Sequence, residues 1–72
     1  MRTRSEYARQ ALEHYCRSKG EPMDTLECAI IDLLADLLHL AQVEGLDAFL
    51  LSRIAAQHFL VEKETALIQH ER

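Results

Sequence analysis

The chain has 72 residues, of which 49% are hydrophobic and 28% charged, and its formal net charge is -4 at pH 7. This length predicts a single domain over residues 1–72, and the single Pro and two Gly exclude collagen-like chains and turn-rich β-proteins. The hydrophobic fraction is too high for a disordered chain, and no apolar run reaches the ~18 residues of a membrane-spanning helix.

The first predicted helix covers about residues 4–19. Thr3 and Glu6 have the spacing of a capping box, in which each side chain accepts a hydrogen bond from a backbone N–H of the other. The last turn is basic, as the helix dipole favours, and Gly20 supplies a left-handed stop. We expect this helix to be the shortest of three.

The second predicted helix covers about residues 25–44. Asp24 and Glu27 repeat the capping-box spacing at its start. Gly45 followed by Leu46 is typical of a Schellman ending.

The third predicted helix covers about residues 48–70, with Asp47 as its N-cap. Only a few residues link it to the preceding helix. So short a link favours an antiparallel hairpin. The predicted fold is therefore all-α, a helical hairpin preceded by a shorter helix.

Each of the two longer helices carries more apolar surface than the other one can cover. The apolar sector of residues 25–44 is about 180° wide, whereas one helix contact needs about 100°. The first helix has little to add. We therefore predict a homodimer packed as a helical bundle, and the alternative is a monomer in which the first helix folds across the hairpin. The predicted self-association residues are Ile31, Leu34, Leu38, Phe49, Leu60 and Leu67.

Two groups of polar residues are weak candidates for a metal site. Asp32, Asp36 and His39 share one helix face, and His58 and Glu62 form a second pair four residues apart. The first group lies opposite the apolar sector, and the helical His-Glu-x-x-His and Glu-x-x-His motifs are absent from the sequence. We therefore expect no metal and no other cofactor.

Charge is distributed unevenly along the chain. Residues 1–20 carry a net charge of +3, and residues 21–46 carry six acidic residues and no Lys or Arg. The basic first helix raises DNA binding as an alternative, but the negative total charge and the few aromatic residues argue against it. We expect this helix to be attracted to an acidic surface, and we expect Asp32, Asp36 and His39 to bind a basic protein partner.

The two cysteines, Cys16 and Cys28, are too few for a disulfide framework. The N-terminal residues lack the apolar stretch of a secretory signal. The sequence therefore predicts a cytoplasmic protein with free thiols.

Three segments carry a resemblance to known proteins: Asp32-Leu-Leu-Ala-Asp36-Leu-Leu-His39-Leu, Gly45-Leu-Asp47 and Ala56-Gln-His58-Phe-Leu-Val-Glu62. Together they resemble small uncharacterised helical proteins of bacteria, phages and mobile elements. The resemblance covers about half the chain and implies an accessory protein that works by binding another macromolecule.

The acidic helical hairpin is also similar to the all-α nucleoside-triphosphate pyrophosphohydrolases. That resemblance implies a magnesium site built from a Glu-x-x-Glu pair and a second acidic pair. Here Glu27, Asp32 and Asp36 are the candidates, and none reproduces the first pair.

We therefore predict a non-enzymatic protein–protein interaction module, an adaptor, regulator or inhibitor that a phage or mobile element would encode. No catalytic residue is assigned. A metal-dependent nucleotide pyrophosphohydrolase is the first alternative, and a small DNA-binding regulator is the second.

Overall fold

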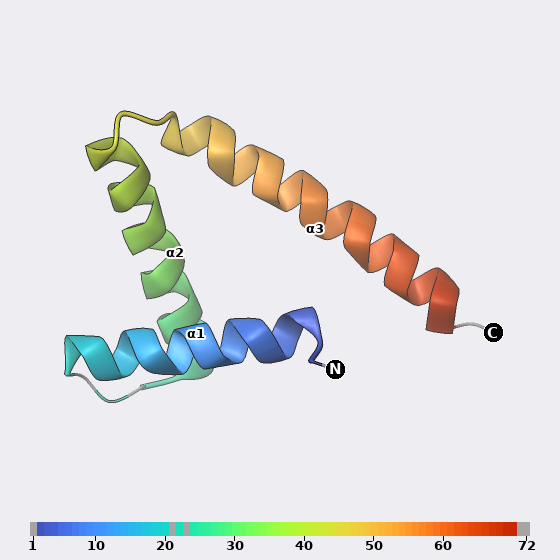
Figure 1. Cartoon of the computed structure of the whole chain (residues 1–72), viewed down its shortest axis with the longest axis horizontal. Helices are drawn as coiled ribbons and strands as arrows, with labels where there is room; N and C mark the ends of the chain where they lie inside the picture. Colours follow the sequence, from blue (N-terminus) through green and yellow to red (C-terminus); the bar gives the residue numbers. More distant parts are fainter. Residues whose placement is uncertain (1, 21, 23, 71–72) are drawn as a thin grey trace. The chain divides into compact units, whose positions relative to one another are not determined.

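The computed structural model describes residues 2–20, 22 and 24–70, with the side chains of the last helix described as far as Glu64. In chain order the elements are α1 (Arg4–Lys19), α2 (Leu26–Val43) and α3 (Ala48–His70) (Figure 1). No strand occurs in the described residues. The prediction of an all-α fold with three helices is confirmed.

The chain divides into two compact units, Met1–Leu37 and Leu38–Arg72. The first unit holds α1 and most of α2, and the second holds the end of α2 and α3. A single domain over residues 1–72 and an antiparallel hairpin of residues 25–44 and 48–70 both depend on how these units combine. Both stay predictions.

The start of α1 has the predicted capping box. Thr3 is extended (φ -81°, ψ 168°), and its Oγ1 accepts a hydrogen bond from the Glu6 amide at 3.2 Å. The Thr3 amide donates in return to Glu6 Oε1 at 2.7 Å. Because that bond favours the carboxylate, it lowers the pKa of Glu6 below its usual value. At the other end, Gly20 adopts the left-handed conformation (φ 72°), as predicted.

The start of α2 corrects one prediction, because Thr25 and not Asp24 is the N-cap. Thr25 Oγ1 accepts from the Cys28 amide at 3.1 Å, and the Thr25 carbonyl accepts from the Ala29 amide at 3.0 Å. Asp and Thr are both good N-cap residues, so two adjacent caps compete and the spacing to Glu27 does not decide between them. Glu27 remains in the first turn, where its charge suits the helix dipole.

The end of α2 is a Schellman motif, as predicted. The Leu46 amide donates to the Ala41 carbonyl at 2.8 Å, and the Gly45 amide donates to the Gln42 carbonyl at 3.1 Å. Gly45 has a φ of 77°, which a residue with a side chain rarely adopts. The chain therefore leaves α2 in a fixed direction.

The start of α3 follows almost immediately and is capped by Asp47, as predicted. Asp47 Oδ1 accepts from the Leu50 amide at 3.0 Å, and its carbonyl accepts from the Leu51 amide at the same distance. The link between α2 and α3 is thus held by local hydrogen bonds at both ends.

The cap of α2 is testable with two alanine substitutions. Thr25→Ala should lower the free energy of unfolding by about 1 kcal/mol, because the Cys28 amide loses its acceptor. Asp24→Ala should cost clearly less. Urea denaturation followed by circular dichroism measures both, and a larger loss for Asp24→Ala would contradict the cap seen in the structure.

Candidate interaction surfaces

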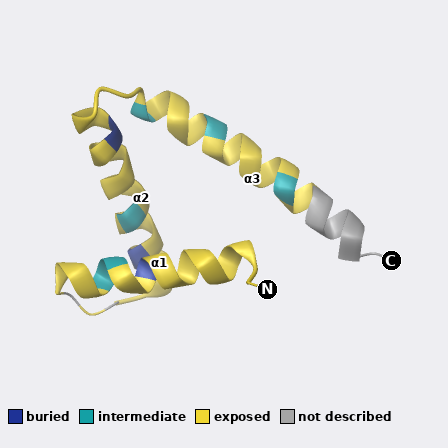
Figure 2. Cartoon of the chain, viewed as in Figure 1, coloured by how far each residue is buried: buried dark blue, intermediate teal, exposed yellow. Residues whose placement is uncertain are grey.

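Few side chains are removed from solvent. Among the described residues, the buried hydrophobic ones are Leu12, 4% exposed, and Ala29 and Ala41, each 6% exposed (Figure 2). Two of the three are alanines, whose burial contributes little. Within the described part of the two units, the hydrophobic core is therefore small.

Large apolar side chains are exposed instead, on all three helices and on the link. Phe49 is 88% exposed, and Val43 is 79% exposed. The other exposed ones are Tyr7, Leu26, Ile30, Ile31, Leu34, Leu37, Leu38, Leu40, Leu46, Leu50, Leu51, Phe59, Leu60 and Val61. Large contiguous patches of exposed apolar surface are typical of interaction sites in proteins.

Five of the six predicted self-association residues belong to this exposed set. On α2, Ile31 is 62%, Leu34 is 57% and Leu38 is 36% exposed. On α3, Phe49 and Leu60 are exposed. The side chain of Leu67 lies outside the described residues. The structure thus places the described members where another surface can reach them.

Within the first unit, α1 and α2 form an apolar groove of about 360 Å³. Its α1 side carries one charged residue, Arg9, among small and apolar neighbours. The lining consists of Ser5, Ala8, Arg9 and Leu12 from α1 and Leu26, Ile30, Leu33, Leu34 and Leu37 from α2. Grooves of this kind, apolar and between two helices, are typical binding surfaces for another helix.

A polar cluster joins α1 to α2 elsewhere in the first unit. Tyr15 Oη donates to Asp36 Oδ2 at 2.5 Å. Lys19 Nζ donates to Tyr15 Oη at 3.2 Å and lies 3.8 Å from Asp36 Oδ2. The Lys19 ammonium also lies 5.1 Å from the centre of the Tyr15 ring. These contacts fix the end of α1 on α2.

The same cluster raises the pKa of Tyr15. The main cause is the hydrogen bond to Asp36, which holds the phenol proton, and desolvation acts in the same direction; Lys19 opposes it. The phenol donates only while protonated, so the contact stabilises the unit below the usual tyrosine pKa of about 10. That contribution is lost as the pH rises through the raised pKa of Tyr15.

Sequence reasoning missed this cluster. Tyr15 and Lys19 are four residues apart, so their contact on α1 could be predicted from the sequence. Their meeting with Asp36 depends on how α2 is rotated against α1, and no spacing in the sequence encodes that rotation.

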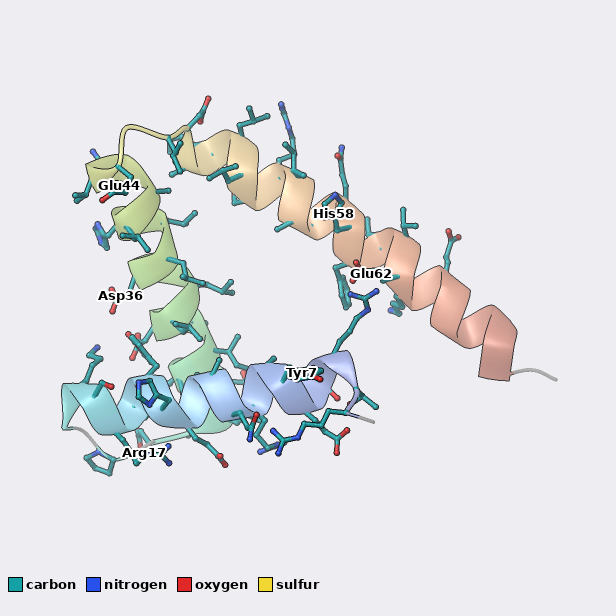
Figure 3. The ribbon with its side chains drawn as sticks, in the orientation of Figure 1. Tyr7, Arg17, Asp36, Glu44, His58 and Glu62 are labelled. Atoms are coloured by element: carbon teal, nitrogen blue, oxygen red, sulfur yellow. The ribbon has the colours of Figure 1, made fainter. Side chains whose placement is uncertain are left out.

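The residues predicted as polar candidates differ in their exposure and in their contacts. Asp36 projects from α2 and is occupied by Tyr15 and Lys19 (Figure 3). Asp32 and His39 are exposed on the same helix. His58 and Glu62 lie on α3 in the second unit, where His58 is exposed and Glu62 is half-buried.

Asp32 also lines a small hollow of about 80 Å³ together with both cysteines. Cys16 is half-buried and Cys28 is exposed, and both thiols are free.

Titration of Tyr15 tests the cluster directly. In a Tyr7→Phe background Tyr15 is the sole tyrosine, so the ultraviolet absorbance of tyrosinate reports on it alone. Asp36→Asn should lower the pKa of Tyr15 towards its usual value, because the charged acceptor is removed. Asp32→Asn, on the same helix, is the matched control and should leave the titration unchanged. Identical titration curves for the two variants would refute the contact.

Among the residues that the structure describes, no three His, Cys, Asp or Glu side chains gather where they could hold a metal ion. No described helix has the length and apolarity required to cross a membrane.

In comparisons with protein-family models, curated proteins and solved structures, no match to this chain was found.

Proposed function

We propose that this chain is a non-enzymatic protein–protein interaction module that works as a homodimer. The observation that carries the proposal is the row of exposed Leu, Ile and Phe side chains on α2 and α3. In the dimer these faces form one shared helical core. Within each copy, α2 and α3 form the antiparallel hairpin that the short link 44–47 favours.

Burial of these side chains would drive the association. Full burial of a Leu or Ile contributes about 1.5–3 kcal/mol, and association itself costs about 4–15 kcal/mol. Because many such side chains are exposed, their combined burial is what we propose offsets that cost.

For the second partner we propose a protein with a basic surface, bound in the cytoplasm through the acidic face of α2. Residues 21–46 carry six acidic residues and no Lys or Arg, so they present a negative field. Asp32 and His39 are exposed on that face, and Asp36 lies between them in sequence. An accessory protein of a phage or mobile element that occludes a host complex would use such a surface.

Self-association is tested by light scattering after gel filtration at micromolar concentration. The expected mass is twice 8.3 kDa. Leu34→Asp should shift the chain to monomer, because it places a charge in the shared core. Leu34 is 57% exposed in the single chain, so the substitution should leave the helices intact.

The matched control is His39→Asp, which adds an acidic side chain opposite the apolar sector of α2. It should remain dimeric. A wild-type chain with the mass of one copy at every concentration would overturn the proposed self-association.

The acidic face is tested by charge reversal. Asp32→Lys replaces an acidic side chain by a basic one, and His39→Glu adds an acidic side chain on the same face of α2. A basic partner should therefore bind the first variant more weakly and the second at least as tightly as the wild type. Co-precipitation with the tagged protein, repeated at high salt, measures both. A partner retained equally by Asp32→Lys and the wild type would not be using this face.

A further inference from the structure

The two cysteines of the chain lie at one small hollow between α1 and α2. Cys16 comes from α1 and Cys28 from the first turn of α2, and both line the same space of about 80 Å³. They are too far apart in the sequence for a helix spacing to bring them together. Their common position results from the packing of the two helices within the first unit.

Each cysteine lies beside the contact between these helices. Leu12 precedes Cys16 by one helical turn and is buried, so Cys16 lies on the face of α1 that packs against α2. Ala29 follows Cys28 directly, is buried and lines the same hollow. The packing of α1 on α2 therefore keeps both thiols at one place.

The two thiols differ in their access to solvent. Cys28 is exposed, whereas Cys16 is half-buried. A dissolved disulfide therefore reaches Cys28 first, and Cys16 lines the same hollow as the product of that reaction. An accessible thiol with a second thiol placed to resolve its oxidised form is typical of a reversible redox pair.

We propose that Cys16 and Cys28 form a reversible disulfide that fastens α1 to α2, with a low-molecular-weight disulfide such as oxidised glutathione as the oxidant. The Cys28 thiolate attacks one sulfur of oxidised glutathione, forms a mixed disulfide and releases one glutathione thiolate. The Cys16 thiolate then attacks the Cys28 sulfur, closes the bridge and releases the second glutathione thiolate. The protein dithiol thereby loses two protons and two electrons, and oxidised glutathione is reduced to two thiols.

The bridge has a consequence for the first unit. In the reduced chain, α1 is held on α2 by the contacts among Tyr15, Lys19 and Asp36 and by a small core. A disulfide removes freedom from the unfolded chain, and its strain in the folded chain is small where the fold already places the thiols together. Oxidation should therefore stabilise the packing of α1 on α2, and a reducing compartment should release it.

Equilibration with glutathione tests the proposal. The wild-type chain is incubated at several ratios of reduced to oxidised glutathione, in native buffer and in high urea, and free thiols are alkylated before denaturing mass spectrometry. The effective concentration of one thiol at the other should be at least about tenfold higher in the native chain than in urea. By linkage, oxidation should raise the free energy of unfolding by a similar factor, which is about 1.4 kcal/mol for tenfold.

The single serine substitutions are the matched controls. Cys16→Ser should accumulate the glutathione adduct of Cys28, because the second step has no attacking thiol. Cys28→Ser should form its adduct more slowly, since Cys16 is half-buried. Neither variant should form the bridge or show the rise in stability that oxidation gives the wild type.

These outcomes are independent of self-association, because the bridge lies within one chain. The expected product is a bridged species with the mass of one 8.3 kDa chain. Glutathione adducts without a bridge, or a disulfide-linked species of twice that mass, would overturn the proposal. Equal effective concentrations in native buffer and in urea would also overturn it, because the fold would then add nothing to the meeting of the thiols.

Discussion

The structure depends on one constraint, which is that its described helices offer too little surface for their own apolar faces to pack against. A helix buries its apolar sector only against another surface, and α1 supplies little beyond Leu12 for this purpose. A domain of this size has a small margin of stability even when its core is complete. The exposed Leu and Ile side chains of α2 are therefore a cost to the stability of the single chain, and in the proposed dimer they would supply the affinity between copies.

Local hydrogen bonds define the helices where the core does not. The capping box at Thr3, the Schellman motif at Gly45 and the Asp47 cap each involve residues close in sequence. Such motifs depend on short spacings, which is why the sequence predicts the helix bounds within a residue. The N-cap of α2 lies one residue later than predicted, because Asp24 and Thr25 are adjacent and both are suited to cap a helix.

The candidate surfaces were predictable only in part. The width of the apolar sector of α2 indicated that Leu34 and Ile31 would lack cover, and both are exposed. The contact of Tyr15 with Asp36 and the groove beside Arg9 were not predictable, because both require the rotation of one helix against the other. Periodicity gives the face of each helix, but the pairing of faces is a tertiary property.

The proposed contacts use different sides of α2, and this makes them compatible. The groove residues Ile30 and Leu34 lie on the apolar sector, while Asp32 and His39 lie on the opposite one. Apolar burial would supply most of the affinity between copies. Because a two-fold dimer displays everything twice, it would present two acidic faces at a fixed spacing. A partner with two basic sites at that spacing would bind the dimer more tightly than two separate chains, so self-association would itself determine which partner is bound.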